Sequence, residues 1–276
     1  MSEPKLLVFD LDGTLLDTKR RVPEDVHALL SALRARGIET TLATGRPFAS
    51  ARRFVNALDV GVPIIVFNGA VIALPGGRSL WSRRLPKQVA REALCLLQRA
   101  SLSSYIYLEV ADSFFYTDRT SAATEYIMTK DGVDCRIERD LLALVDRHDA
   151  DPIKLFSIGP REELEKVQQA FLAAAPGFTC VFSEYDMLEF LGDGVTKGKA
   201  LHVLCEHVGI ATDKVMAFGD NLNDLEMIQE AGVGVSMTSA PDVLQRAAST
   251  TTEDLESFLR SRFKDSLGME EQHACE

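Results

Sequence analysis

The chain has 276 residues, of which 46% are hydrophobic, and its formal net charge is −11. This length suits one large domain or two smaller ones, and the acidic balance argues against the clustered lysine and arginine of a nucleic-acid-binding surface. No apolar run approaches the ~18 residues that a membrane span needs, and a strand-like segment begins too close to the N-terminus for a secretory signal.

Strand-like and helical segments alternate at both ends of the sequence. Strands this apolar, separated by helices, predict a parallel sheet covered by helices on both faces. In the first part of the chain we expect strands at 5–9, 38–43 and 63–67, with helices near 23–36 and 48–58. In the last part we expect strands at 214–218 and 232–235, with helices near 199–208, 222–230 and 254–263.

The middle of the chain follows a different pattern, because strands occur there in succession. This order is typical of an α+β domain with an antiparallel sheet, inserted into the α/β domain. We therefore expect residues 1–82 and 187–276 to form the α/β core and residues 83–186 to form a cap. Within the cap we expect strands at 104–108, 113–116, 153–158 and 178–182, and helices at 87–100, 122–130 and 162–174.

Five cysteines are scattered along the chain without a CxxC pair. This usage is typical of free thiols in a reducing compartment. We therefore expect a cytoplasmic protein that binds neither nucleic acid nor membrane and that is a monomer or a weak homo-oligomer.

Two carboxylates, Asp10 and Asp12, follow the first predicted strand with one residue between them. Residues two apart on a strand point to the same side. Two like charges held together raise at least one pKa and cost stability. A shared cation, a shared proton or exposure to water could offset this cost.

Four polar clusters are candidates for chemistry, and three of them directly follow predicted strands. Ligands bind beyond the carboxyl ends of parallel strands, so we expect the clusters to converge. Their carboxylates, hydroxyl, arginine and lysines are groups that handle a phosphate together with Mg²⁺, which prefers carboxylate, water and phosphate oxygens. The clusters are DLDGT at 10–14, TGR at 44–46, GVTKGK at 194–199 and GDNLND at 219–224.

These motifs, in this order, resemble the haloacid dehalogenase (HAD) superfamily, and the long insert resembles the Cof-type phosphatases with a C2B cap. The matches span residues 10 to 224, and Asn68-Gly69-Ala70 matches the NGA of that family. The resemblance implies a doubly wound, Rossmann-like parallel sheet with an inserted α+β cap that supplies substrate specificity. Among the cap residues, Tyr107, Tyr116, Asp118 and Arg119 are candidates that the sequence alone does not rank.

The resemblance also implies a role for each residue of the clusters. Asp10 would be the nucleophile that forms an aspartyl-phosphate, and Asp12 the general acid and base. Arg46 would contact the substrate or pair with a carboxylate, and Lys197 is preferred to Lys199 as the lysine that holds the phosphate. The phosphate and substrate ligands would be Leu11, Thr44, Gly45, Arg46, Lys197 and Asn223. The metal ligands would be Asp10, Asp12 through its backbone carbonyl and Asp220, supported by Asp224.

A halide leaves without a proton, whereas an alkoxide needs one, so the presence of Asp12 favours phosphate-ester hydrolysis over dehalogenation. We therefore expect a Mg²⁺-dependent phosphomonoester hydrolase for a small metabolite such as a sugar phosphate, a nucleotide or pyridoxal phosphate. One alternative is a phosphosugar mutase resembling the phosphomannomutases. Another is a non-catalytic sensor that binds a phosphorylated metabolite.

Overall fold

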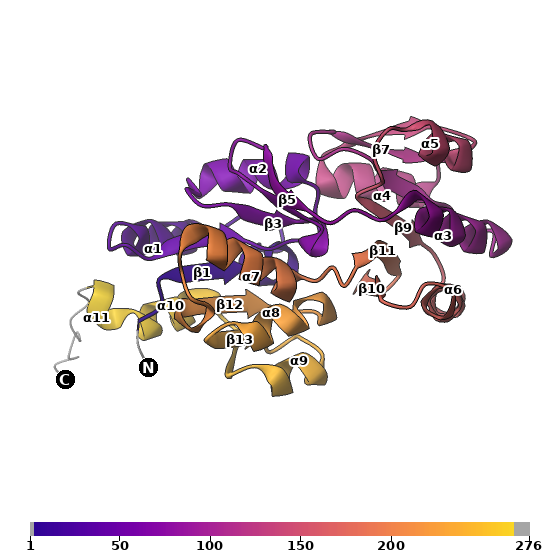
Figure 1. Ribbon diagram of the computed structural model, residues 1–276. Coiled ribbons are helices and arrows are strands. Elements are labelled where there is room, and N and C mark those ends of the chain that lie inside the picture. Colours follow the sequence, from indigo (N-terminus) through magenta and orange to yellow (C-terminus); the bar gives the residue numbers. More distant parts are fainter. Residues whose placement is uncertain (1–2, 268–276) are drawn as a thin grey trace.

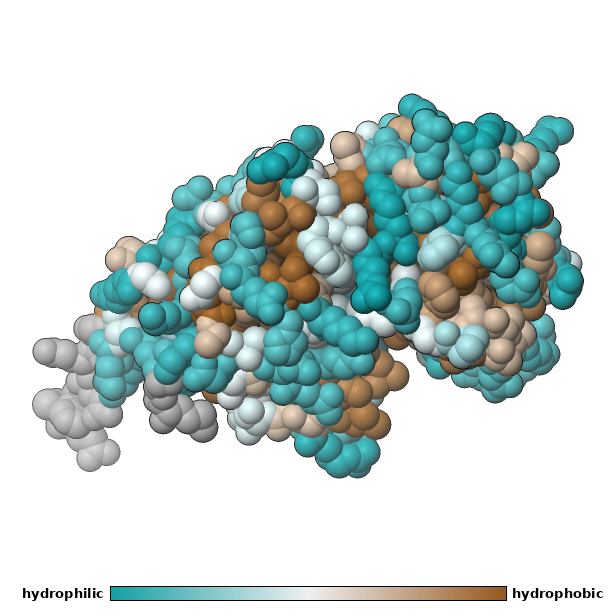
Figure 2. All heavy atoms as spheres, in the orientation of Figure 1, coloured by the Kyte–Doolittle hydropathy of each residue, from teal (hydrophilic) through white to brown (hydrophobic). Residues whose placement is uncertain are grey.

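A computed structural model describes residues 3–267. The first and last parts of the chain form one lobe, and the middle of the chain forms a second lobe beside it (Figure 1). Mostly hydrophilic residues cover the visible face of both lobes (Figure 2). Within residues 3–267, no helix combines the length and apolar character needed to cross a membrane.

The first lobe, the core, contains a sheet of five parallel strands. A parallel bridge between Ala43 and Ile65 extends this sheet toward an antiparallel set of three short strands. The five strands, in spatial order, are β14 (Thr250–Thr252), β13 (Val233–Met237), β12 (Val215–Gly219), β1 (Leu6–Phe9) and β2 (Glu39–Leu42). The three short strands are β3 (Ile64–Val66), β4 (Val71–Ala73) and β5 (Ser79–Ser82).

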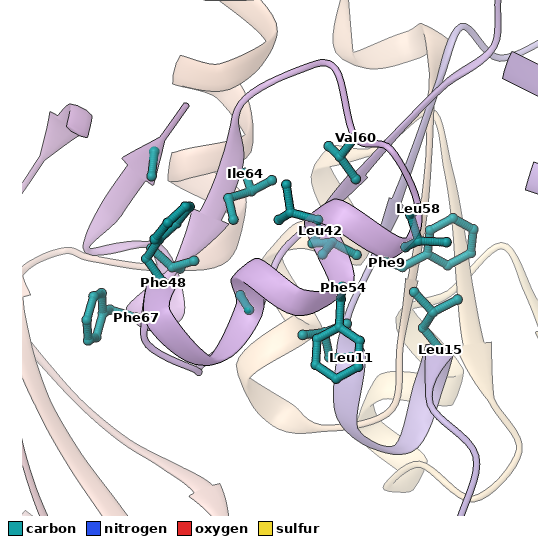
Figure 3. Packing of buried hydrophobic residues seen from close by; sticks show 14 of the residues in the cluster. Phe9, Leu11, Leu15, Leu42, Phe48, Phe54, Leu58, Val60, Ile64 and Phe67 are labelled. Atoms are coloured by element: carbon teal, nitrogen blue, oxygen red, sulfur yellow. The ribbon is translucent and has the colours of Figure 1, made fainter. Parts of the chain in front are cut away.

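Helices cover both faces of the core sheet, which confirms the doubly wound prediction. Leu7 and Phe9 of β1 belong to the apolar cluster on one face, where Phe9 lies near α2 (Figure 3). Leu6 and Val8 belong to the cluster on the other face. Burying a side chain of this size contributes about 1.5–3 kcal/mol. The first face carries α1 (Glu24–Arg34), α2 (Phe48–Ala57) and α10 (Leu255–Arg262), followed by α11 (Lys264–Leu267); the second carries α7 (Lys197–Val208), α8 (Leu225–Glu230) and α9 (Asp242–Ala247).

The second lobe, the cap, is built on a sheet of six strands. In spatial order they are β10 (Phe178–Glu184), β11 (Met187–Asp193), β9 (Lys154–Ile158), β6 (Tyr105–Tyr107), β7 (Phe114–Thr117) and β8 (Asp134–Ile137). All neighbours are antiparallel except β7 and β8, which α4 (Ala122–Asp131) connects. One face packs against α3 (Lys87–Arg99), α5 (Leu141–Arg147) and α6 (Arg161–Ala174). The other face places Tyr105, Tyr107 and Phe156 in the apolar cluster shared with the core.

The α+β insert is confirmed, but three of its elements were not predicted. Strand β8 is mostly exposed and lacks an apolar pattern, and α5 lies in a stretch for which we predicted no element. Strand β11 is almost fully buried, as a core strand would be, yet it pairs with β9 and β10 of the cap. The sequence placed the second domain boundary after residue 186. Because β11 pairs in the cap sheet, we propose that the core resumes at residue 194.

Candidate active site

The carboxyl ends of β1, β2 and β12 lie at the same edge of the core sheet, and the four clusters meet there. Lys197 begins α7, and its side chain is fully buried. Its ammonium donates hydrogen bonds to Oδ1 of Asp10 and to Oδ1 of Asp224, both at 2.6 Å. One buried lysine therefore joins the ends of β1 and β12.

A group of three carboxylates surrounds this lysine. One oxygen from each of Asp10, Asp220 and Asp224 lies within 4.8 Å of the others. Burial raises the pKa of Asp10 well above its ordinary value; Lys197 opposes this increase, and Asp224 and Asp220 add to it. Burial and then Asp224 raise the pKa of Asp220 to about 6. Three carboxylates against one ammonium leave an excess of negative charge, which suits a divalent cation.

Asp224 is the member of the group whose oxygens are both in use. Its Oδ1 accepts from Lys197, and its Oδ2 accepts from the backbone amides of Asp220 and Asn221, each at 3.1 Å. Within residues 3–267, Asp10 and Asp220 each use only Oδ1. That of Asp10 accepts from Lys197, and that of Asp220 accepts from the Thr14 hydroxyl. The side chains of Asp10 and Asp220 could therefore hold a metal ion. Asp224 instead stabilises the loop at Asp220 and Asn221.

Gly13 gives Asp220 the room that it occupies. Its φ of +83° lies in a region that L side chains rarely adopt. A Cβ atom at this position would stand 2.2 Å from Oδ2 of Asp220. Glycine is thus required here both by the turn after β1 and by the neighbouring carboxylate.

Asp12 forms a two-bond ion pair with Arg46. Nε and Nη2 of Arg46 each donate to one oxygen of Asp12 at 2.6 Å. The third nitrogen, Nη1, donates to the Ser50 hydroxyl at 2.9 Å and to the backbone carbonyl of Lys130, in the cap, at 3.0 Å. Of the two alternatives left open by the sequence, Arg46 therefore adopts the pairing with a carboxylate. Burial raises the pKa of Asp12, but the hydrogen bonds and charge of Arg46 outweigh it, and the pKa is lowered.

We expect Arg46→Gln to raise the pKa of Asp12 by about 1 unit or more, because the carboxylate loses its charged partner. As the general base that the sequence motif implies, Asp12 would have to be ionised to activate water, so the acid limb of kcat should move to higher pH. A pH profile of kcat from 4.5 to 8 measures this shift. Ser50→Ala removes one acceptor of Nη1 and keeps the ion pair, so its acid limb should match that of the unmodified protein. An unshifted limb in Arg46→Gln would contradict this role.

The remaining predicted ligands occupy two positions relative to the site. Asp10, Asp12, Thr44, Gly45, Arg46, Asp220 and Asn223 line one cavity, whereas Leu11, Lys197 and Asp224 lie behind its wall. The Thr44 hydroxyl accepts from the Arg46 amide at 3.1 Å and keeps its own proton for donation. Nδ2 of Asn223 donates to Asn68 at 2.9 Å, and its Oδ1 is buried without a hydrogen bond from residues 3–267. An unpartnered acceptor suits a water molecule better than a phosphoryl oxygen.

A buried ion pair that the sequence analysis missed fastens the cap to this site. Nζ of Lys154 lies 3.0 Å from Oε1 of Glu189 and donates to the carbonyl of Gly45 at 3.0 Å. The other oxygen of Glu189 accepts from Asn68 at 2.7 Å. Lys154 and Glu189 lie in otherwise apolar strand segments, and such isolated charges were the signal that could have found them.

The cavity has a volume of about 310 Å³ and is lined by both lobes. Small-molecule sites typically measure about 300–1,000 Å³, so this cavity is at the small end of the range. The cap contributes Tyr107, Ile127, Lys130 and Asp131 to its wall. Of the four cap candidates taken from the sequence, Tyr107 alone appears among the lining residues in the described chain.

The raised pKa of Asp220 predicts how stability depends on pH without metal. Between the ordinary carboxyl pKa and a pH of about 6, Asp220 binds more protons in the folded state than in the unfolded state. The contribution of Asp220 to the free energy of unfolding therefore falls as the pH rises. In EDTA at pH 8 we expect Asp220→Asn to be more stable than the unmodified protein by about 1–3 kcal/mol. The difference should shrink as the pH is lowered toward 4. Urea denaturation measures it, and a less stable variant at pH 8 would refute the prediction.

The fold and the site define a class of protein: an α/β enzyme core whose strand ends gather acidic residues and a lysine beneath an α+β cap. The sequence pattern of the haloacid dehalogenase-like hydrolases matches residues 7–257. The chain belongs to this family of enzymes, as the order of its motifs indicates.

Similar proteins support this assignment. The chain is 32% identical to an HMP-PP phosphatase of Serratia proteamaculans, over 86% of this chain and 84% of that protein. It is 25% identical to the 5-amino-6-(5-phospho-D-ribitylamino)uracil phosphatase YitU of Bacillus subtilis, over 95% of this chain and 97% of that protein. A crystal structure of a haloacid dehalogenase-like hydrolase from Bacteroides thetaiotaomicron shares 26% identity with a TM-score of 0.82, covering 95% of this chain and 100% of that chain.

Proposed function

We propose that this chain is a Mg²⁺-dependent phosphomonoester hydrolase that acts on a small phosphorylated metabolite through an aspartyl-phosphate. The observation that carries the proposal is the placement of Asp10, held by Lys197 and beside Asp220, at the wall of a cavity lined by both lobes. The printed names of the relatives describe phosphatases of small phosphorylated compounds, which supports the same reaction.

In the first step, Asp10 attacks phosphorus, the bond from phosphorus to the leaving oxygen breaks, and Asp12 gives a proton to the leaving group. In the second step, water attacks the aspartyl-phosphate, Asp12 takes its proton, and inorganic phosphate leaves. The low pKa of Asp12 suits the second step. A phosphoryl group bound nearby carries like charge and raises that pKa, which favours the first.

The other residues position and neutralise the phosphoryl group. Lys197 lowers the pKa of Asp10 against the effect of burial, and it has one further N–H to donate to a phosphoryl oxygen. The hydroxyl of Thr44 and the amides of Gly45 and Leu11 complete the set of donors. Bound by Asp10, Asp220 and the Asp12 carbonyl, Mg²⁺ would neutralise charge on the transferring group. Catalysis of this kind depends mainly on position and charge.

The size of the cavity and its position between the two lobes support a small metabolite as substrate. A volume of about 310 Å³ holds a phosphate and a compact leaving group, and two lobes surround it. We keep sugar phosphates, nucleotides and pyridoxal phosphate as candidate substrates. The four cysteines in the described part of the chain are free, in keeping with our expectation of a reducing, cytoplasmic environment.

Release of p-nitrophenol from p-nitrophenyl phosphate tests the proposed function. We expect turnover with Mg²⁺, loss of turnover in EDTA, and recovery when Mg²⁺ is added in excess. The Asp10→Asn variant, purified in parallel, serves as the control for contaminating phosphatases. Activity that EDTA leaves intact would overturn the metal dependence. Binding of phosphorylated compounds without hydrolysis, across some dozens of them, would favour the sensor alternative.

A further inference from the structure

Two polar groups of the cap enter the cavity without hydrogen bonds. The side chain of Tyr107, at the end of β6, is 1% exposed, and its hydroxyl has no hydrogen-bond partner among residues 3–267. Oδ1 of Asp131, at the end of α4, is also buried without a hydrogen bond from this part of the chain. Buried polar groups in folded proteins are normally hydrogen-bonded, so a bound molecule is expected to supply the partners.

Asp131 occupies a position that the fold alone does not favour. It is the last residue of α4, where the partial negative charge of the helix end repels a carboxylate. Its nearest paired cation is Nη1 of Arg46, at 3.5 Å, which already donates to Ser50 and to the Lys130 carbonyl. The three cations nearest to it each have another carboxylate partner, in the pairs Arg46–Asp12, Lys130–Glu184 and Lys154–Glu189. Each of these three cations is thus paired with a carboxylate other than Asp131.

The two residues line the same cavity. Burial raises the pKa of Tyr107 well above its ordinary value, and the charges of Asp131 and Glu189 add to the increase. The hydroxyl therefore keeps its proton and can donate as well as accept. Burial raises the pKa of Asp131, and the charges of Lys130 and Arg46 oppose the increase. In its ionised form this carboxylate only accepts, and it then requires an O–H or N–H from its ligand. Apolar side chains of Ile127, Phe156 and Met187 form the neighbouring wall.

We propose that Tyr107 and Asp131 are the specificity-determining pair for the leaving group, and that they select an uncharged leaving group carrying an O–H or N–H donor. A second phosphate or a carboxylate at this position would meet the charge of Asp131. A polyol and a nitrogen heterocycle with a hydroxyl or amino group share the required chemistry. This inference rests on the proposed function, because it concerns the same cavity.

Matched pairs of substrates test the inference. Glycerol 1-phosphate and propyl phosphate differ in the hydroxyl groups of the leaving group. Pyridoxine 5′-phosphate and benzyl phosphate differ in hydroxyl groups on a ring and also in the ring nitrogen and a methyl group. We expect kcat/KM to favour the donor-bearing member of at least one pair by tenfold or more, and the pair that responds identifies the source of the donor. We expect 3-phosphoglycerate, which carries a carboxylate, to be a poor substrate relative to glycerol 1-phosphate.

Variants then separate the hydrogen bonds from the charge. Tyr107→Phe and Asp131→Leu should each reduce the preference within the responding pair by fivefold or more. Asp131→Asn keeps an acceptor and removes the charge, so it should improve 3-phosphoglycerate relative to glycerol 1-phosphate. Tyr116→Phe and Asp134→Asn, which change cap residues outside the cavity wall, should retain the preferences of the unmodified protein.

Failure of the inference is distinct from failure of the proposed function. No hydrolysis of p-nitrophenyl phosphate by the unmodified protein would count against the proposed function. Normal hydrolysis of that ester with no preference in either pair would overturn the inference alone. The inference would also be overturned if the substrate preferences of Tyr107→Phe and Asp131→Leu stayed within twofold of those of the unmodified protein.

Discussion

Asp10→Asn is expected to lower kcat by about 10⁴-fold or more, the scale seen when a nucleophile that acts as part of a unit is removed. The amide keeps the shape of the side chain but cannot attack phosphorus. The variant should remain folded, because Lys197 keeps its 2.6 Å contact with Asp224 and one of three crowded carboxylates loses its charge. Steady-state hydrolysis of p-nitrophenyl phosphate and a denaturation curve measure the two effects separately.

Asp17→Asn is the matched control for this variant. Oδ1 of Asp17 accepts from the amides of Lys19 and Arg21 in an exposed turn, and an asparagine oxygen can do the same. Its activity should therefore be normal. A second readout concerns the intermediate. With p-nitrophenyl phosphate, whose leaving group departs without a proton, Asp12→Asn should accumulate phosphoenzyme, because the base for water is missing, and adding Asp10→Asn should abolish it. More than a tenth of normal turnover in Asp10→Asn would mean that the nucleophile is another group.

Lys197→Met should cause the largest loss of stability, about 3–5 kcal/mol of the free energy of unfolding, because it leaves buried carboxylates without a cation. Lys197 is fully buried, and it is the ammonium that contacts both Asp10 and Asp224. Since Mg²⁺ would supply the missing positive charge, it should stabilise this variant more than it stabilises the unmodified protein. Urea denaturation with Mg²⁺ and with EDTA measures both effects.

Lys199→Met is the control, two residues further along the same helix. Its side chain is exposed, and the loss should stay within about 0.5 kcal/mol. The pair of variants also tests the choice between the two lysines of GVTKGK. Equal losses from both variants would contradict the role given to Lys197.

The core of the fold could be predicted because its signals are local. The strands around Phe9 and Phe218 are apolar throughout, the strand that ends at Leu42 is buried at three of its four residues, and the polar clusters directly follow them. Parallel strands end at one edge of a sheet, so the convergence of Asp10 and Asp220 follows from the order of elements alone. The same reasoning does not extend to β11, because the sequence of a buried strand has the same apolar pattern in the core sheet and in the cap sheet.

The cap side of the site could not be predicted for a related reason. Lys154 and Glu189 become meaningful only when two distant strands pair and bring them 3.0 Å apart. The pairing of Arg46 with Asp12 depends on a side-chain conformation, and the sequence allowed substrate contact equally. Asp131 lies just beyond the helix that we expected at 122–130, and nothing in the sequence distinguished it before the fold placed it against the cavity.

Two hydrogen bonds cross from the cap to the TGR segment: Lys154 to the Gly45 carbonyl and Arg46 to the Lys130 carbonyl. Any separation of the lobes must break both bonds, and the segment that we propose to bind the phosphate then loses two of its supports. Entry of substrate and departure of product would thus take place while the catalytic groups are least ordered. The rate of turnover would then be limited by how quickly the two lobes open and close, and a higher solvent viscosity would lower it.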